Sequence, residues 1–224
     1  MQTWWLWTCG GYLCGSIPFG LLLGKTKGID IRQAGSRNIG ATNLGRLLGR
    51  RWGVVCFILD VLKGAIPVLA AGAVMGVLGE EDVASADAWR WLAVGAAAVL
   101  GHVFPVWLGL RGGKGVATSV GAVAGFWPTL TLPGLAAVVT WVILARIFRY
   151  VSLASIAAAV ALPVSLLVIG ALRGADHERL VPFYVVTVLL AALVVVRHRS
   201  NIARLVAGTE SRIGESKVRS EQGS

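Results

Sequence analysis

Three polar stretches of this 224-residue chain carry residue types that bind phosphate. The first covers residues 35–46 and reads GSRNIGATNLGR. Its glycines let backbone N–H groups approach an anion closely, and its Arg46 guanidinium can grip a phosphate or carboxylate through two donors. An ordinary interfacial loop of turn residues and basic side chains is the alternative. The residues expected to contact an anion here are Gly35, Ser36, Asn38, Thr42, Asn43 and Arg46.

The second stretch joins GHVFP at 101–105 to RGGKGVAT at 111–118. Its glycine turn opens an apolar segment, so free N–H groups and the positive end of a helix dipole would face an anion. It is not a Walker loop, because Gly115 rather than Ser or Thr follows Lys114 and Leu108 stands where the first glycine should be. ATP or GTP hydrolysis is therefore disfavoured. The expected phosphate contacts are Gly112, Gly113, Lys114, Gly115, Thr118 and His102, although for His102 taken alone a packing role is favoured.

The third stretch begins with RHRSNIARL at 197–205 and continues to Glu210. His198, Asn201 and Leu205 recur at helical spacing and can share one face. Imidazole, with an ordinary pKa of about 6.5, suits His198 to general-base chemistry. A basic cluster anchored on lipid phosphates is the alternative for this stretch.

Composition indicates that these stretches are positioned by membrane helices. The chain is 56% hydrophobic and only 14% charged, with a mean hydropathy of +0.73, whereas soluble domains carry about 25% charged residues. The net charge of +10 would suggest nucleic acid in a soluble protein, but no RNP motif or Cys/His finger spacing supports that partner. Cys9, Cys14 and Cys56 lie in apolar runs without a CxxC, which predicts neither disulfides nor metal ligands.

Uncharged runs predict seven transmembrane helices at 3–23, 53–78, 91–108, 116–127, 130–145, 151–172 and 180–196. One long helix over 116–145 would leave six, although Pro128 and Pro133 oppose it. With seven, 17 Lys and Arg lie inside and 3 outside; with six, the division is 11 to 9. The positive-inside rule therefore favours seven, with the N-terminus outside and the C-terminus cytoplasmic.

That topology predicts an all-α integral membrane protein with one polytopic domain over 1–224. It places loops 24–51 and 109–116 and the tail 197–224, including Lys217 and Arg219, on one face. All three polar stretches then meet at the cytoplasmic side.

Asp60 and Lys63 lie one helical turn apart inside the second predicted span, about 10 Å deep. Ionisable groups at such depth are costly, and they pair or serve function. A structural ion pair is the favoured interpretation, and support for the floor of the site is the alternative. The tryptophans near predicted span ends suggest an aromatic belt; they are Trp4, Trp5, Trp7, Trp89, Trp91 and Trp107.

Taken together, these stretches closely resemble the bacterial acyl-phosphate:glycerol-3-phosphate acyltransferases, the PlsY family. The similarity covers GSIPFG in the first span, GSRNIGATNLGR, ILDVLKG, GHVFPVWLGLRGGKGVAT and RHRSNIARLVAGTE, in order over nearly the whole chain. Arg37 departs from the pattern, since the family usually has glycine there. It adds charge near the site.

The resemblance implies a seven-span enzyme of the bacterial inner membrane with a cytoplasmic active site. It implies transfer of a fatty acyl group from acyl-phosphate to the 1-hydroxyl of glycerol 3-phosphate, giving lysophosphatidate and phosphate in phospholipid synthesis. No cofactor or metal is implied. Membrane lipids and a soluble enzyme that makes acyl-phosphate are the expected partners.

By the same resemblance, the loop at 112–118 would bind the donor phosphate. Ser36, Arg46, Lys114, His198 and Asn201 would bind and orient glycerol 3-phosphate, and Glu210 would order the last motif. Either His198 or a substrate phosphate would take the hydroxyl proton.

The rival function is a transporter of phosphorylated solutes, which would also need spans and basic loops. Such transporters usually show internal repeats around a midplane site, whereas these polar stretches gather at one face. A lipid-binding scaffold is a third possibility, disfavoured by so many clustered donors.

Overall fold

The computed structural model describes residues 3–215, so Lys217 and Arg219 of the predicted basic tail lie outside the described residues. All regular secondary structure in the described part is helical. Its elements, in chain order, are α1 (Trp4–Gly15), α2 (Phe19–Lys25), α3 (Ala41–Leu48), α4 (Arg50–Met75), α5 (Ser85–Val103), the 3-10 turn η1 (Val106–Leu108), α6 (Val116–Gly125), α7 (Thr131–Phe148), α8 (Val151–Leu172), α9 (His177–Arg197) and α10 (Arg199–Val206).

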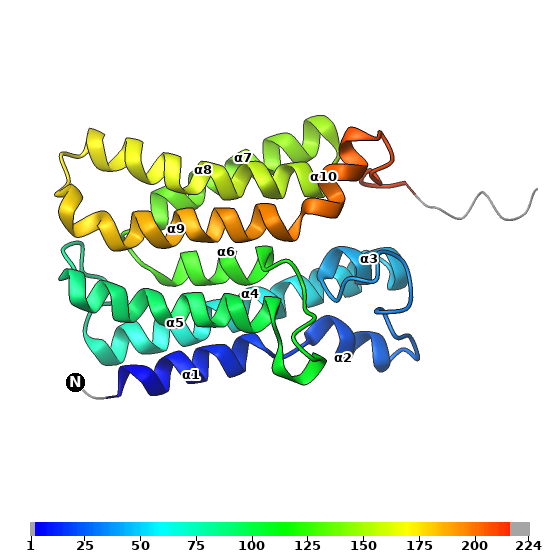
Figure 1. Cartoon of the computed structure of the whole chain (residues 1–224), viewed down its shortest axis with the longest axis horizontal. Helices are drawn as coiled ribbons and strands as arrows, with labels where there is room; N and C mark the ends of the chain where they lie inside the picture. Colours follow the sequence, from blue (N-terminus) through cyan, green and yellow to red (C-terminus); the bar gives the residue numbers. More distant parts are fainter. Residues whose placement is uncertain (1–2, 216–224) are drawn as a thin grey trace, which may run out of the picture.

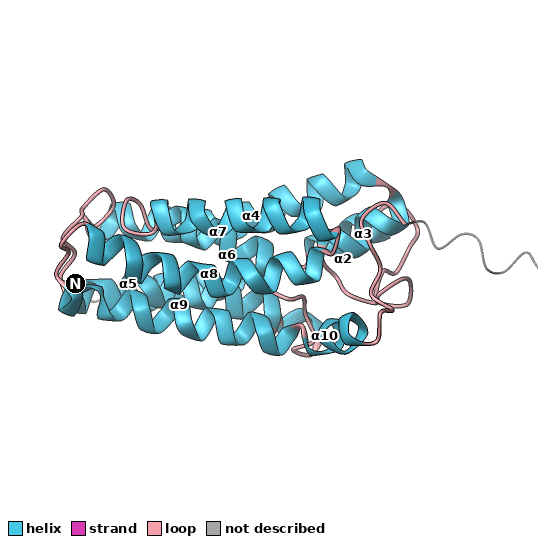
Figure 2. Ribbon diagram, turned by 90° about the horizontal axis from the view of Figure 1, so that it is seen from above, coloured by secondary structure: helices cyan, strands magenta, loops and turns pink. Residues whose placement is uncertain are grey.

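The long helices lie side by side as an elongated bundle (Figures 1 and 2). Within residues 3–215, six helical segments are long and apolar enough to cross a membrane, with α1 and α2 counted as one segment. Helix α6 is apolar but has only 10 residues. The expectation of an all-α integral membrane protein is confirmed at this level.

Several predicted boundaries agree with the structure, and one alternative is wrong. Helix α8 occupies the predicted 151–172. A single helix over 116–145 does not form, because α6 ends at Gly125 and α7 begins only at Thr131, after a turn that contains Pro128. Inside the first predicted span, α1 ends at Gly15 and α2 starts after Pro18, which lacks the N–H group that a continuous helix requires.

A cluster of aromatic side chains in the core links α5, the turn after α6 and α9. Trp91 on α5 meets Phe126 edge-to-face with ring centroids 4.9 Å apart, and Phe126 meets Phe183 of α9 in the same way. Trp91 is fully buried and its indole N–H donates to the Val68 carbonyl. The prediction that Trp91 lies in an aromatic belt is therefore wrong, because its hydrogen bond and packing place it inside the bundle. Trp4, Trp5, Trp89 and Trp107 are exposed, as a belt requires.

The polar stretches gather at one end of the bundle. Helix α3, the loop before α6 and helix α10 lie together at the right in Figure 1, and the first described residues lie at the opposite end. Helix α8 packs on both α7 and α9, while α9 contacts α5 and α6 contacts α7. A site at this end is therefore built from both the early and the late helices.

Candidate active site

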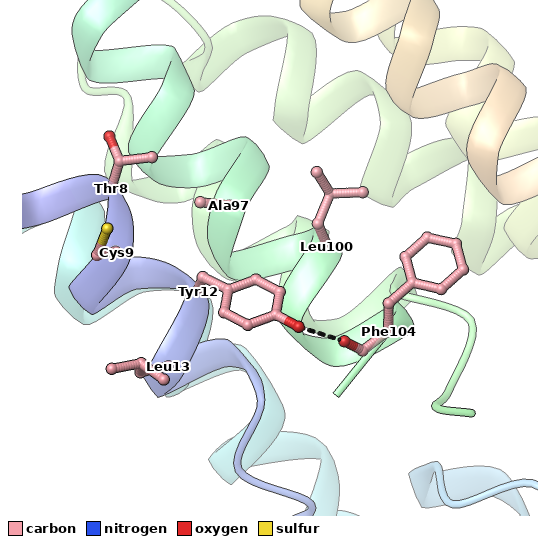
Figure 3. Close-up of a pocket in the computed structure, with 7 residues that line it drawn as sticks. All are labelled: Thr8, Cys9, Tyr12, Leu13, Ala97, Leu100 and Phe104. Atoms are coloured by element: carbon pink, nitrogen blue, oxygen red, sulfur yellow. Dashed lines mark hydrogen bonds between the residues drawn. The ribbon is translucent and has the colours of Figure 1, made fainter. Parts of the chain in front are cut away.

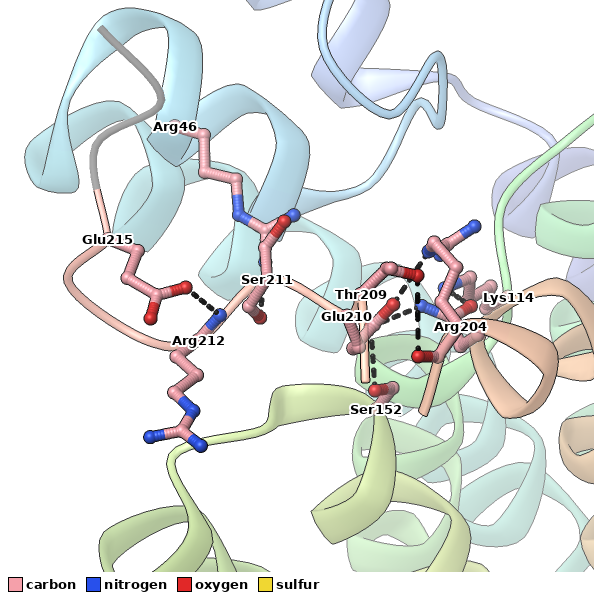
Figure 4. Close-up of polar contacts among 10 residues, drawn as sticks. Arg46, Lys114, Ser152, Arg204, Thr209, Glu210, Ser211, Arg212 and Glu215 are labelled. Carbon is pink, nitrogen blue, oxygen red and sulfur yellow. Dashed lines mark hydrogen bonds and ion pairs between the residues drawn. The ribbon is translucent and has the colours of Figure 1, made fainter. Parts of the chain in front are cut away.

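A chain of short polar contacts joins the second and third stretches (Figure 4). The Lys114 ammonium, in the loop before α6, donates to the Asn201 side-chain oxygen at 2.5 Å. The Asn201 amide on α10 donates in turn to Glu210 Oε1 at 2.6 Å. These two bonds fix the orientation of the Asn201 amide, with its oxygen towards Lys114 and its nitrogen towards Glu210.

The Glu210 carboxylate accepts hydrogen bonds from two further side chains. Ser152, at the start of α8, donates to Oε1 at 2.7 Å, and Arg204 donates to Oε2 at 2.7 Å. Burial alone would raise the pKa of Glu210, but the hydrogen bonds from Asn201, Ser152 and Arg204 outweigh burial and lower that pKa. The carboxylate is thus charged and fully engaged within the protein.

The surroundings of Lys114 are strongly cationic. Its pKa is lowered to about 8, chiefly by burial; the charge of Glu210 opposes this shift, and the charges of Arg204, Arg46 and Arg197 add to it. Arg46 extends from α3 towards the tail, where its guanidinium donates to the Ser211 carbonyl at 3.5 Å (Figure 4). A group of cations with a single acid between them is suited to binding anions.

His198 lies between α9 and α10 and is almost fully buried. Its Nδ1 is 2.8 Å from the Val194 carbonyl, so this nitrogen carries the ring proton and Nε2 is left as an acceptor. Burial, followed by the charge of Lys114, lowers the pKa of His198 to about 4. The ring is therefore neutral at physiological pH.

The glycine loop is held by its own backbone. The N–H groups of Gly112 and Gly113 donate to the carbonyls of Val103 and His102. Arg197, at the end of α9, donates to both glycine carbonyls at 3.1 Å. The first N–H groups of α6 are the ones without a helical partner, since no preceding turn supplies a carbonyl.

Two residues expected to bind phosphate in this region are buried. His102 is 4% exposed and Thr118 is 0% exposed. The Thr118 hydroxyl has no hydrogen-bond partner among the described residues. Their side chains lie beneath the loop rather than at its surface.

Asn43 holds the first stretch together. Its side-chain oxygen accepts the Ser36 N–H, and its amide donates to the carbonyls of Ile31, Ala34 and Asn38. Because it is 1% exposed and fully hydrogen-bonded, Asn43 shapes the loop. The Asn38 side chain likewise caps the N–H of Gly40.

The other candidate anion-binding residues of the first stretch face solvent. Gly35, Ser36, Thr42 and Arg46 are exposed around the folded loop. The structure thus places Arg46 and His198 within electrostatic range of Lys114.

Three residues of the network were not expected from the sequence. Arg197 and Arg204 lie within the third stretch, where they read only as part of a basic cluster. Ser152 carried no signal, since it stands in an apolar run and meets Glu210 only through the fold. Among residues 3–215, no cluster of His, Cys, Asp and Glu side chains could hold a metal ion.

An apolar groove of about 570 Å³ opens between α1 and α5 (Figure 3). Its lining residues are Thr8, Cys9, Tyr12, Leu13, Ala97, Leu100 and Phe104. The Tyr12 hydroxyl donates to the Phe104 carbonyl at 2.7 Å. The Phe104 ring lies 5.7 Å from the Arg197 guanidinium, which holds the glycine loop. The groove thus ends beside the polar site.

Fold and site together define a helical integral membrane protein that carries an electropositive, hydrogen-bonded site at one end of its bundle. A family model described as glycerol-3-phosphate acyltransferase matches residues 5–208. The chain belongs to the glycerol-3-phosphate acyltransferase family, and it is an acyltransferase of the membrane-embedded kind.

Similar proteins agree with this assignment. The glycerol-3-phosphate acyltransferase of Trichlorobacter lovleyi is 46% identical over 92% of this chain and 95% of its own length. That of Geotalea daltonii is 48% identical over 90% and 93%. The crystal structure of PlsY (YgiH), an integral membrane glycerol 3-phosphate acyltransferase, in its glycerol 3-phosphate form, has a TM-score of 0.82 at 40% identity and covers 95% of this chain and 96% of that one. Its lysophosphatidic acid form gives 0.79 at 39% identity, with the same coverage.

Proposed function

We propose that this protein transfers a fatty acyl group from acyl-phosphate to the sn-1 hydroxyl of glycerol 3-phosphate, giving lysophosphatidic acid and phosphate. The observation that carries the proposal is the linked Lys114–Asn201–Glu210 network with Arg46 and Arg204 beside it. It supplies cations and oriented donors for two phosphate groups. The similar PlsY structures, described as glycerol 3-phosphate and lysophosphatidic acid forms, support the acceptor and the product.

An acyl-phosphate donor fits the chemistry of these side chains. Its phosphate is already a good leaving group, so neither a metal nor a covalent enzyme intermediate is required. The task left to the protein is to hold two anions together, orient them and exclude water. In the reaction, the acceptor oxygen forms a bond to the acyl carbon, and the carbon–oxygen bond to phosphate breaks with its electron pair.

Each site residue has a proposed role. Arg46, Lys114 and Asn201 hold the substrate phosphates and orient glycerol 3-phosphate, with Ser36 at the rim of the first loop. The start of α6 binds the donor phosphate through its N–H groups. Glu210 orders Asn201 and Arg204, while Asn43 and Asn38 shape the first loop.

The hydroxyl proton goes to a substrate phosphate. A phosphate monoester has a second pKa of about 6, whereas the pKa of His198 is lowered to about 4. The phosphate is therefore the stronger base at neutral pH. His198 Nε2 accepts a hydrogen bond from glycerol 3-phosphate and orients it.

The acyl chain of the donor occupies the groove between α1 and α5 (Figure 3). Its volume of about 570 Å³ falls within the range of about 300–1,000 Å³ typical of small-molecule sites. Its end at Phe104 adjoins the glycine loop through Arg197. A chain in this groove would deliver its phosphate to the polar site.

The single polytopic domain crosses the bacterial inner membrane seven times, with α6 as the short crossing and the site on the cytoplasmic face. The chain runs along the bundle so that the first described residues and α10 lie at opposite ends (Figure 1). An odd number of crossings agrees with that arrangement and with the excess of basic residues predicted inside.

The test mixes purified protein in lipid with acyl-phosphate and glycerol 3-phosphate, and follows lysophosphatidate and released phosphate. We expect equal amounts of both, and no lysophosphatidate with an acyl thioester as donor. Arg46→Ala and Asn201→Ala should abolish turnover, whereas Arg173→Ala, at the far end of the bundle, should leave it unchanged. Counterflow of labelled glycerol 3-phosphate through vesicles without acyl transfer would instead indicate a transporter.

A further inference from the structure

A buried polar chain lies directly beneath the glycine loop. Asp60 and Lys63 on α4 form an ion pair of 2.7 Å, and their side chains are 3% and 2% exposed. The Lys63 ammonium also donates to the Ile17 carbonyl at 2.8 Å, where α1 gives way to α2. These contacts confirm the expected ion pair, and they link α4 to the break in the first span.

Asp60 has a second partner on the other side. Its Oδ1 lies 3.7 Å from Nδ1 of His102, near the end of α5. That separation is longer than a direct hydrogen bond, so the contact is electrostatic. Because both side chains are almost fully buried, each is effectively screened from bulk water, and charge on Asp60 orients the imidazole ring strongly.

The opposite edge of the His102 ring supports the loop. A Cβ atom added at Gly113 would overlap His102 Nε2, and one added at Gly112 would overlap the His102 carbonyl oxygen. The Gly113 N–H also donates to that carbonyl at 3.1 Å. The two glycines therefore pack directly against His102. Lys114 is the next residue in the chain.

From these contacts we propose that Asp60 and His102 are positioning residues for acyl transfer. Asp60 fixes the His102 ring, the ring fixes Gly113, and Gly113 sets the ammonium of Lys114 against Asn201. Arg197 completes the support from α9 by holding the glycine carbonyls. The inference rests on the proposed function and extends it to residues that do not touch substrate.

A link between helices alone would not need this arrangement. Lys63 already ties α4 to the α1–α2 break through Ile17, and a buried ion pair inside a membrane is costly to keep. The Asp60 carboxylate also faces His102, whose ring lies against Gly113, the residue before Lys114.

The principal variant is the double change Asp60→Asn with Lys63→Met. Asp60→Asn alone would leave a buried, unpaired ammonium and risk unfolding, whereas the double change is neutral and close in size. We expect kcat to fall about 10- to 100-fold, the effect of a displaced group near the reacting atoms. The KM for glycerol 3-phosphate should change less than about threefold, since Arg46 keeps its place on α3.

A second variant tests whether Asp60 acts through His102. His102→Asn keeps a polar group facing Asp60 but removes the ring edge beneath Gly113. We expect a similar fall in kcat, and less than about a twofold further fall when all three changes are combined, because coupled residues are not additive.

The matched control is Asp87→Asn with Arg90→Met, which removes another ion pair of the same spacing, at 2.8 Å, from the start of α5. It should leave kcat and thermal unfolding unchanged. Wild-type kcat in either folded site variant, or independent effects in the triple variant, would overturn the proposal. So would loss of the folded state in both, which would assign these residues to stability. Lysophosphatidate production by the wild type in the same preparations separates these outcomes from failure of the proposed function.

Discussion

Lys114 is influenced by both the basic and the acidic side chains of the site. Its ammonium faces Asn201 and lies among Arg46, Arg197 and Arg204, with Glu210 as the opposing charge. Burial and these cations weaken its hold on a proton, so a bound phosphate would restore it. The protonation of a single lysine thereby couples substrate binding to pH.

This coupling predicts the alkaline limb of the pH profile. Since the pKa of Lys114 is about 8 in the free protein, kcat/KM should fall as pH rises through about 8, and the limb should move upward in kcat, which reports the substrate complex. Lys114→Arg should remove the limb, because guanidinium stays charged. Initial rates across the pH range measure both. An unchanged limb in Lys114→Arg would assign it to another group.

His198 gives the corresponding prediction for the proton. With a pKa near 4, the ring is a weak base, so His198→Gln should mainly raise the KM for glycerol 3-phosphate. A loss of kcat of about 10²–10⁴-fold, the usual cost of removing a general base, would show that His198 takes the proton. Steady-state kinetics at several acceptor concentrations separate the two effects. Ser200→Ala, an exposed neighbour, serves as the control.

Arg37 carries a local conformational cost. Its φ of 58° lies in the left-handed region, which is unfavourable for residues with a side chain and accessible to glycine without that cost. Arg37→Gly should therefore raise the free energy of unfolding by about 0.5–1 kcal/mol. Equilibrium unfolding measures the gain. Arg37→Ala should show none, since alanine keeps the same penalty, and a gain in Arg37→Ala would point instead to relief of charge repulsion.

At the scale of elements, the sequence predicted helices better than it predicted which side chains they bury. Helix α8 and the break around Pro128 follow from uncharged runs and from proline's missing donor. The break at Pro18 was not predicted, because the run around it is uncharged and has the length of one span. Trp91 was misplaced since a tryptophan near a span end gives no sign of whether it faces lipid or another helix.

The candidate site shows the same division. The family resemblance assigned Arg46, Lys114 and Asn201 to the site. The structure places Lys114 and Asn201 in direct contact, with Arg46 within electrostatic range of Lys114. Asn43 is also an asparagine, but its side chain hydrogen-bonds to backbone carbonyls of its own loop. Such a difference depends on which carbonyls fold around the amide, and no spacing in the sequence encodes it.

The groove between α1 and α5 gives the prediction at this scale. Leu100 lines it and is 42% exposed, so Leu100→Trp should fill part of the groove and shift preference towards shorter acyl chains. A change of about tenfold in the ratio of kcat/KM for long and short donors is expected, since one methylene can be worth that much. Leu62→Trp on α4, with the same 42% exposure outside the groove, should leave the ratio unchanged. Equal ratios in both variants would place the acyl chain elsewhere.

At the scale of the whole molecule, the site depends on helices that are distant in sequence. Helix α3 comes from the early part of the chain and the glycine loop from its middle, whereas α10 and the segment that carries Glu210 come from its end. The tail segment crosses between them: Ile213 exchanges hydrogen bonds with Arg149 in the α7–α8 turn, and Ser211 accepts from Arg46. The number of crossings therefore decides whether these parts can meet on one side of a membrane.

Seven crossings predict opposite exposure for two positions near the ends of α8 and α10. Arg173, after α8, should face outside, and Ser200, on α10, should face the cytoplasm. Single-cysteine variants Arg173→Cys and Ser200→Cys, made after replacing Cys9, Cys14 and Cys56, can be treated in intact cells with a membrane-impermeant thiol reagent. Arg173→Cys should react at once and Ser200→Cys only after permeabilisation. With the N-terminus outside, the reverse pattern would mean six crossings, which would put α10 and Glu210 across the membrane from Arg46. Because Lys114, Asn201 and Glu210 are joined by hydrogen bonds of 2.5 and 2.6 Å, that result would be incompatible with the site itself.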